Sequence, residues 1–189
     1  MPSWSRIATR MRVPLGFLFA AAYLWFARPL WIWVLAGCVL VVAGLGVRAA
    51  ASGHIRKNRE LATTGPYAYT RNPLYLGSIF IATGFVLAAR NPWIAIAALF
   101  MFLVIYMPVI KAEETYLRSA FPGYSAYAEH VPRLLPRLVA WRPDGAVVSA
   151  EDAPKFSGEL YRKHREYQAA LGSVLMIGAL ILKMILVNH

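Results

Sequence analysis

The sequence predicts an all-α protein: an integral membrane bundle of five transmembrane helices that forms one domain over residues 1–189. Hydrophobic residues make up 59% of the chain, and charged residues make up only 15%. The hydrophobic residues are gathered into five stretches without charge. The basic residues lie mostly between these stretches, on the same predicted side of a membrane. These features are typical of a polytopic membrane protein and exclude a soluble multidomain protein.

The charge-free stretches are 13–27, 29–47, 72–89, 91–110 and 167–182. A helix that crosses the bilayer core needs ~20 residues, with a range of ~17–25. The second, third and fourth stretches meet this length. The first has 15 residues and the last has 16. These two can still cross if Arg12, Arg28 and Lys183 extend their charged ends to the headgroups.

The first two stretches predict a helical hairpin over 1–47 that turns at Arg28-Pro29. A signal peptide is the alternative for the first stretch, because basic residues precede it. The end of this stretch at 23–26 reads Tyr-Leu-Trp-Phe, however, and lacks the small residues of a cleavage site. We therefore prefer a transmembrane helix.

The basic residues predict the orientation, because they are enriched in cytoplasmic loops. With the N-terminus in the cytoplasm, 17 of the 20 basic residues face the cytoplasm, all except Arg28, Arg90 and Lys183. All nine acidic residues fall on the same side. The net charge of +11 then serves topology and binding to anionic membrane lipids, and no nucleic acid partner is predicted. We expect the cytoplasmic membrane of a bacterium or archaeon.

Two long segments face the cytoplasm in this arrangement. The first, 48–72, lies within a core region over 48–141 that also contains the third and fourth helices. The second, 111–166, contains a predicted loop over 142–155 that is rich in Pro, Asp and Ser. Residues 156–167 predict an amphipathic helix at the membrane surface that leads into the last transmembrane helix, so that 142–189 form the third part of the domain. Its predicted charged face consists of Glu159, Arg162, Lys163 and Glu166.

The segment 65–77 is the most informative part of the chain, because a polar, aromatic turn runs directly into an apolar helix. Arg71 lies at the mouth of this helix, Asn72 is a good N-cap and Pro73 suits the first turn. Free backbone N–H groups, a positive dipole end and a guanidinium then meet at the water boundary. Such a helix start binds anions, here next to lipid.

Glu113 and Glu114 follow the fourth apolar stretch. A solvated helix end is the simplest interpretation of such a pair. The helix dipole, however, disfavours carboxylates at a C-terminus. If the helix continues, both residues share a face with Leu117, and Tyr124 and Tyr127 follow with a spacing of three. A carboxylate, an apolar wall and hydroxyl-bearing rings together suit a nucleoside.

No metal site is predicted. The single cysteine, Cys38, lies within an apolar helix, where it behaves as a small apolar residue. The four histidines lack the spacing of metal ligands.

Two motifs in a fixed order carry a resemblance to a known family. The first is Gly65-Pro66-Tyr67 followed by Arg71-Asn72-Pro73-Leu74-Tyr75-Leu76-Gly77. The second is Glu113-Glu114, Leu117, Phe121, Tyr124 and Tyr127, and then Val131-Pro132-Arg133 and Pro136. On a membrane protein of several helices, these motifs resemble the isoprenylcysteine carboxyl methyltransferase family. The phospholipid N-methyltransferases share much of the pattern. The resemblance covers about residues 48–137.

This resemblance implies S-adenosylmethionine as cofactor, bound on the cytoplasmic side, and a lipid-soluble or lipidated acceptor as substrate. The residues implied in catalysis are Arg71, Glu114 and Arg133. The residues implied in cofactor binding are Tyr67, Arg71, Asn72, Pro73, Tyr75, Gly77, Glu113, Glu114, Leu117, Tyr124, Tyr127, Pro132, Arg133, Leu135 and Pro136. The carboxyl methyltransferases usually carry His where this chain has Asn72, which brings the chain nearer to the phospholipid-methylating relatives and to bacterial members whose substrate is unassigned.

Two other classes are weighed beside the methyltransferase. Membrane sterol reductases share a similar C-terminal arrangement and use a nicotinamide cofactor, but they typically carry an acidic residue where this chain has Ser78. A membrane scaffold or lipid-binding protein without catalysis is the other alternative.

Overall fold

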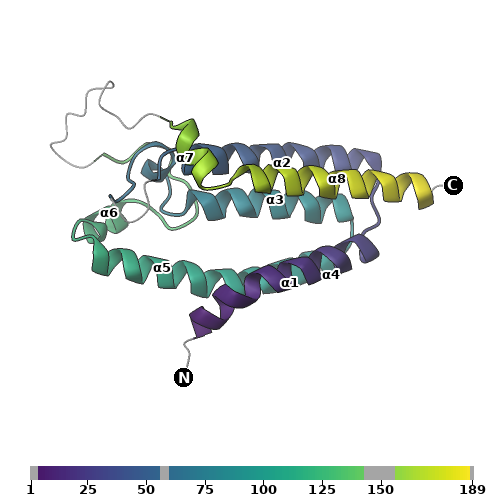
Figure 1. The fold of residues 1–189 in the computed structure, drawn as a ribbon, viewed down its shortest axis with the longest axis horizontal. Helices are drawn as coiled ribbons and strands as arrows, with labels where there is room; N and C mark the ends of the chain where they lie inside the picture. Colours follow the sequence, from purple (N-terminus) through teal and green to yellow (C-terminus); the bar gives the residue numbers. More distant parts are fainter. Residues whose placement is uncertain (1–3, 56–59, 143–155, 188–189) are drawn as a thin grey trace. The chain divides into compact units, whose positions relative to one another are not determined.

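The computed structural model describes residues 4–55, 60–142 and 156–187. Within these ranges every regular element is helical, which confirms the predicted all-α class (Figure 1). The long helices are α1 (Trp4–Phe26), α2 (Trp31–Ser52), α3 (Pro73–Ala89), α4 (Pro92–Met101), α5 (Met107–Ala120) and α8 (Tyr167–Val187). The short ones are η1 (Gly65–Ala68), η2 (Phe102–Tyr106), α6 (Tyr124–His130) and α7 (Gly158–Lys163). Apart from Arg142, the predicted loop over 142–155 lies outside the described residues.

Three of the described helices are long and apolar enough to cross a membrane, which identifies an integral membrane protein. They are Trp31–Ser52, Pro92–Ala120 and Tyr167–Leu186. The other two predicted spans are present as shorter apolar helices, Val13–Phe26 and Pro73–Ala89. The count of five spans therefore stays a prediction, which depends on how far charged flanking residues extend the short helices.

The helix ends differ from the charge-free stretches in instructive ways. The first helix begins at Trp4, well before Val13, because backbone hydrogen bonding does not stop where charged side chains begin. It ends at Phe26, shortly before Pro29, since a residue that precedes proline is biased away from helical angles. The helix from Pro92 continues through a π-turn, η2, and ends only at Ala120.

The predicted surface helix over 156–167 is also shorter than expected. The structure has α7 over Gly158–Lys163, and its N-cap Ser157 accepts a hydrogen bond from the Leu160 N–H group. Arg165 then adopts a left-handed φ of 55°, which ends the helical path before α8 begins. Glu166 consequently lies beyond α7 and does not belong to the charged face on which we placed it.

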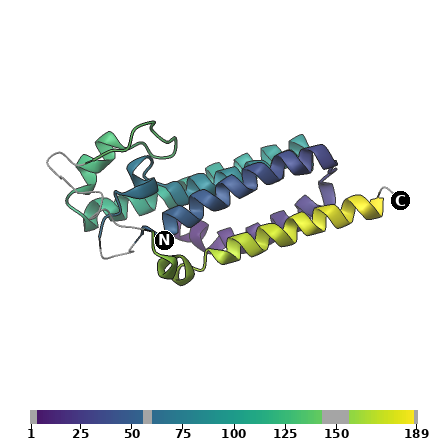
Figure 2. The ribbon, with the colours of Figure 1, turned by 90° about the horizontal axis from the view of Figure 1, so that it is seen from above.

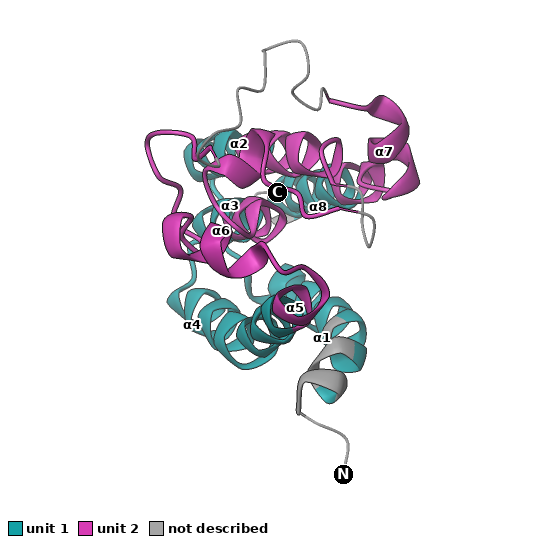
Figure 3. Ribbon diagram, turned by 90° about the vertical axis from the view of Figure 1, so that its left-hand side faces the viewer, with its two compact units in different colours: residues 1–42, 80–115, 172–189 teal, residues 43–79, 116–171 magenta. Residues whose placement is uncertain are grey.

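The chain divides into two compact units, coloured separately in Figure 3. Unit 1 comprises residues 1–42, 80–115 and 172–189, and unit 2 comprises residues 43–79 and 116–171. The boundaries fall inside α2, α3, α5 and α8, so four helices are continuous from one unit to the other.

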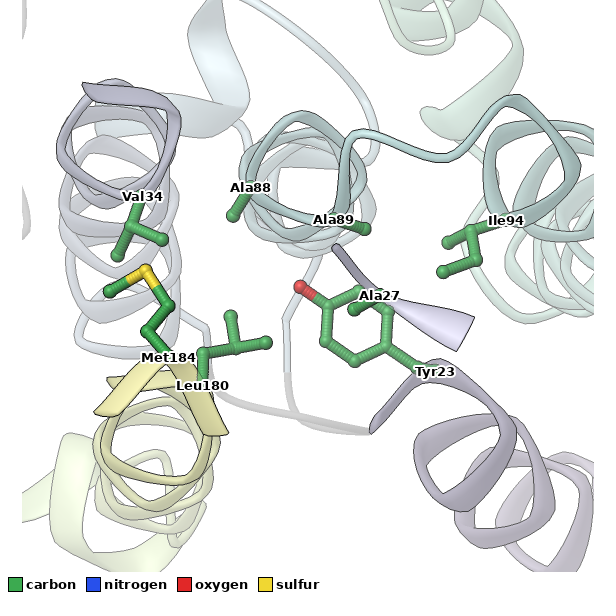
Figure 4. Packing of buried hydrophobic residues seen from close by; sticks show 8 residues of the cluster. All are labelled: Tyr23, Ala27, Val34, Ala88, Ala89, Ile94, Leu180 and Met184. Atoms are coloured by element: carbon green, nitrogen blue, oxygen red, sulfur yellow. The ribbon is translucent and has the colours of Figure 1, made fainter. Parts of the chain in front are cut away.

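Unit 1 has a core of buried apolar side chains (Figure 4). These come from α1, α2, α3, α4 and α8 and from the turn after α1: Tyr23, Ala27, Val34, Ala88, Ala89, Ile94, Leu180 and Met184. The Tyr23 hydroxyl donates a hydrogen bond of 2.8 Å to the Phe85 carbonyl, which satisfies its polar end.

Helices α2 and α3 lie side by side at backbone contact (Figure 2). A Cβ atom at Gly37 would collide with the carbonyl oxygen of Gly84, and a Cβ atom at Gly84 would reach the carbonyl oxygen of Gly37. Small residues permit such close approach of apolar helices, which lack a hydrophobic driving force in lipid.

Candidate functional site

The first motif begins with a tight turn in unit 2. Gly65 has a φ of +57°, a conformation that favours glycine, and η1 follows with Pro66 in its first turn. A Cβ atom at Gly65 would lie 2.6 Å from Cδ2 of His54, so space and backbone angle both require glycine. The turn buries Tyr67 and Ala68 and directs the chain toward the start of α3.

The structure brings the two predicted motifs together. Three backbone hydrogen bonds join residues 68–71 to residues 132–141, and the paired segments run in opposite directions. The bonds are from Arg71 N to Pro132 O (2.9 Å), from Arg137 N to Tyr69 O (3.0 Å) and from Trp141 N to Ala68 O (2.9 Å). Segments about 60 residues apart in sequence thus form one hydrogen-bonded unit.

Two side chains strengthen this pairing. Thr70, only 2% exposed, places its hydroxyl oxygen 3.1 Å from the Arg133 carbonyl and 3.2 Å from the Leu134 carbonyl. The side-chain amide of Asn72 donates to the Arg133 carbonyl at 3.1 Å. Asn72 also holds the predicted capping position, because its own carbonyl accepts the first helical bond from Leu76 N–H. Sequence reasoning missed Thr70, which appeared there only as a spacer.

The tyrosines of the second motif form the core of unit 2. Tyr124 and Tyr127 are 1% and 2% exposed, and their ring centroids lie 6.0 Å apart. The Tyr127 hydroxyl donates a 2.7 Å hydrogen bond to the Tyr67 carbonyl and so ties α6 to η1. Leu117 and Trp141 pack against the same cluster. Tyr127 therefore positions the first motif, and its proton is committed within the protein.

The acidic pair lies within a helix and not at its end. Because α5 continues to Ala120, the argument from the helix dipole is wrong: the dipole acts within the last turn, and Glu114 precedes it. The predicted shared face with Leu117 does follow from the longer helix. Glu114 is 7% exposed whereas Glu113 is exposed, so burial distinguishes the two. A buried carboxylate needs polar or charged partners, whereas an exposed one needs only water.

Gly77 is explained by packing against α2. A Cβ atom there would lie 2.6 Å from Cγ of Arg48 and 2.7 Å from the Gly44 carbonyl oxygen. Arg48 in turn forms a bidentate pair with Glu166, with bonds of 2.9 Å and 3.0 Å. It also donates to the Ser78 hydroxyl at 2.6 Å. Sequence reasoning missed this pair, although Arg48 and Glu166 directly flank two of the apolar stretches.

The remaining predicted residues differ in burial. Pro73 is fully buried, and Tyr75 is half-buried in the first turn of α3. The side chains of Arg71, Pro132 and Arg133 are half-buried. Leu135 is 80% exposed and Pro136 is also exposed, so these two do not take part in the packed cluster. In the part of the chain that the structure describes, no three His, Cys, Asp or Glu side chains gather as a metal centre would require.

These features define a helical membrane protein in which a buried aromatic cluster and a hydrogen-bonded pair of segments hold a cationic helix start. The sequence model of the phospholipid methyltransferase family matches residues 33–123. The predicted resemblance to phospholipid and isoprenylcysteine methyltransferases is thereby confirmed.

Three curated relatives are similar to the chain. The cobalt-zinc-cadmium resistance protein CzcN of Cupriavidus metallidurans is 35% identical over 136 residues, 66% of this chain and 62% of that protein. The nickel-cobalt-cadmium resistance protein NccN of Alcaligenes xylosoxydans xylosoxydans is 35% identical over 122 residues, 59% of this chain and 56% of that protein. Protein-S-isoprenylcysteine O-methyltransferase of Saccharomyces cerevisiae is 32% identical over 108 residues, 50% and 45% of the two chains.

The chain thus spans about six tenths of the length of the first two relatives and less than half of the third. No solved structure matches the chain.

Proposed function

We propose that the protein is an S-adenosylmethionine-dependent methyltransferase that acts on a lipid-soluble acceptor at the cytoplasmic face of a bacterial or archaeal inner membrane. The observation that carries this proposal is the bonded pairing of residues 68–71 with residues 132–141. It joins the two motifs on which the resemblance depends. Five helices would cross the membrane, with the two shorter ones extended by snorkelling basic residues.

The chemistry of the residues fits this cofactor. S-adenosylmethionine presents a carboxylate, an ammonium group and ribose hydroxyls. The Arg71 guanidinium and the N-terminus of α3 suit the carboxylate, since charge-assisted hydrogen bonds and the helix dipole both favour an anion there. The buried carboxylate of Glu114 suits the ribose hydroxyls or the ammonium group. When bound, the cofactor supplies an electrophilic methyl group on its sulfonium.

The protein's own residues then have two tasks. They hold donor and acceptor in line, and they keep water out, because an in-line displacement from a sulfonium needs no protonation of its leaving group. The bonds from Thr70 and Asn72 fix the backbone at Arg133 for the first task. Arg133 would then bind an anionic part of the acceptor.

Two acceptor classes differ in what they require. A carboxylate acceptor, as in isoprenylcysteine methylation, attacks without losing a proton. An amine acceptor, as in phospholipid methylation, must lose one, so that Glu113 or Glu114 would serve as base. Asn72 in place of the usual histidine favours the amine class.

A role in metal resistance is a second candidate, favoured by 35% identity to CzcN and NccN. A methyltransferase would contribute to metal resistance by methylating a membrane component. A comparison of membrane lipids with and without the gene, under metal stress and in its absence, tests this role. Species that differ by one methylene unit are expected to change with the gene.

Binding of S-adenosylhomocysteine to the purified protein tests whether it belongs to the methyltransferase class. Calorimetric titration is expected to show saturable binding of S-adenosylhomocysteine and none of NADPH. Binding of NADPH alone would instead indicate a reductase, and binding of neither would indicate a protein without this catalysis.

A further inference from the structure

A second site of quite different chemistry lies within unit 1. A cavity of about 520 Å³ is lined by residues at the C-terminal end of α1, by the turns that follow α1 and α3, and by α8. Its lining includes Trp25, Arg28, Arg90, Asn91 and Lys183. Two further lining residues, Ala27 and Met184, belong to the buried core cluster in Figure 4.

This cavity contains three cations and no carboxylate. Arg28, Arg90 and Lys183 all line it. They are the three basic residues that the predicted topology leaves outside the cytoplasmic segments. No acidic residue occurs in 1–59, 61–112 or 167–189 of the sequence. Glu113 follows Pro92 by 21 residues on one continuous helical segment, which at ~1.5 Å per residue places it about 32 Å away. Among the residues that the structure describes, no carboxylate lines this cavity beside the three cations.

The Lys183 side chain is already fully used by the protein. The Lys183 ammonium donates to the carbonyls of Leu24, Trp25 and Ala27 at 2.7, 2.9 and 2.8 Å. An ammonium group has three donors, so Lys183 is a fixed positive charge with no proton left for a ligand. Asn91 donates one of its two amide hydrogens to the Phe26 carbonyl and accepts from Trp93 N–H.

The charged hydrogen-bond donors that remain for a ligand are the two guanidinium groups. Both Arg28 and Arg90 are exposed, and among the described residues neither side chain has a hydrogen-bond or ion-pair partner. Arg90 also has a left-handed φ of 51° just after α3, a conformation that favours glycine. An arginine in this conformation lowers the stability of the folded protein. Such strain is found where a side chain has a function.

Exposed tryptophans around the cavity indicate its depth in the membrane. Trp25 lines the cavity and is 80% exposed, and Trp31 and Trp93, just beyond its lining, are 55% and 75% exposed. Tryptophans of this kind lie at the level of the lipid headgroups. Guanidinium groups bind phosphate oxygens in a bidentate manner, and a nearby fixed cation adds attraction.

We propose that this cavity binds the phosphate of an anionic phospholipid headgroup, held by Arg28 and Arg90 and attracted by the fixed charge of Lys183. Since no carboxylate is present to pair with a choline or ethanolamine ammonium group, anionic lipids are preferred over zwitterionic ones. The site is independent of the proposed methyl transfer.

The test uses the full-length protein in detergent micelles, with thermal unfolding measured after addition of phosphatidylglycerol, phosphatidylcholine or inorganic phosphate. Phosphatidylglycerol is expected to raise the unfolding midpoint by roughly 5 °C near saturation, and phosphatidylcholine by much less. The variant Arg28→Gln/Arg90→Gln should lose this rise, and native mass spectrometry should count one bound phosphatidylglycerol fewer. The control Arg10→Gln/Lys111→Gln removes the same charge from exposed positions of unit 1 outside the cavity, and should keep the rise.

A second variant separates loss of lipid binding from a folding defect. Arg90→Gly relieves the left-handed backbone, so it should unfold at a higher temperature without lipid and yet show a smaller rise with phosphatidylglycerol. If the cavity variants and the control respond like the parent, or lose the response equally, the proposal is overturned. If inorganic phosphate gives the full rise in the parent, the cavity is a site for a soluble anion and not for a lipid.

Discussion

Arg48 and Glu166, 118 residues apart in sequence, form a bidentate ion pair at the start of α8. The shortest contact is 2.8 Å, and the side chains are 22% and 10% exposed. Further bonds from Arg48 to Ser78 and to the Leu74 carbonyl extend the network to the first turns of α3. The pair thus fixes the helix whose N-terminus carries Asn72 of the candidate site.

Breaking this pair should destabilise the protein. We expect Arg48→Ala to lower the free energy of unfolding by about 1.5–3 kcal/mol, the range for hydrogen bonds to charged groups. Glu166→Ala should cost less, because Arg48 keeps its bonds to Ser78 and Leu74. Thermal unfolding in micelles of the single and double variants forms a mutant cycle. Strict additivity of the two single effects would show that the pair contributes nothing of its own.

Thr70→Val should weaken the pairing of the two motifs. The substitution keeps the shape of the side chain but removes the hydroxyl that contacts the carbonyls of Arg133 and Leu134. Loss of a hydrogen bond costs about 0.5–1.5 kcal/mol of stability here, because the Arg133 carbonyl keeps its bond from Asn72. We expect that loss together with weaker binding of S-adenosylhomocysteine. Thr115→Val is the matched control, because Thr115 is exposed and, among the described residues, its hydroxyl bonds only to the Lys111 carbonyl of its own helix. Equal effects of both variants would contradict the role given to Thr70.

Gly77→Ala should be poorly tolerated. The added methyl would lie 2.6 Å from Arg48 Cγ and 2.7 Å from the Gly44 carbonyl oxygen, so α2 and α3 must separate there. Overpacking of this kind costs about 1–3 kcal/mol. Gly178→Ala is the control, since nothing lies within 4 Å of the added atom and alanine favours a helix. A lower unfolding temperature for the Gly77 variant alone is expected, and a neutral Gly77→Ala would count against the close approach.

The sequence predicted the helical class, because this class depends on strong local signals, whereas a shared site for the two motifs was implied only by the resemblance to a family. Long charge-free runs define membrane helices, and the run from Arg71 to Gly77 marks a helix start. Thr70 and Arg48 could not be found in this way. Their roles depend on partners about 60 and 118 residues away, and no periodic pattern records such pairing. Glu166 was misplaced for a related reason, since a left-handed Arg165 interrupts an otherwise helical pattern.

Arg71→Gln should reduce the affinity for S-adenosylhomocysteine roughly tenfold to hundredfold, since a lost charge-assisted contact costs about 1.5–3 kcal/mol. The fold should persist, because the pairing at this position uses the Arg71 backbone N–H group. Calorimetric titration measures the affinity. Arg162→Gln on α7 is the control for removal of an exposed cation. Unchanged affinity in the Arg71 variant would assign this side chain to lipid contact instead.

Glu114 and Glu113 provide the sharpest comparison, because they are adjacent in sequence but only Glu114 is buried. Replacement by glutamine keeps the shape and removes the charge. We expect Glu114→Gln to lower activity and Glu113→Gln to leave it nearly unchanged. If Glu114 binds the ribose or the ammonium group, its variant should lose affinity for S-adenosylhomocysteine together with the transfer rate.

If Glu114 instead removes a proton from an amine acceptor, affinity should hold while the rate falls. A carboxylate acceptor would show no such difference, since it needs no base. Transfer rate and affinity, measured together, therefore separate the acceptor classes as well as the two roles. If both variants bind and react like the parent, the carboxylates take no part, and Arg133 becomes the next residue to substitute.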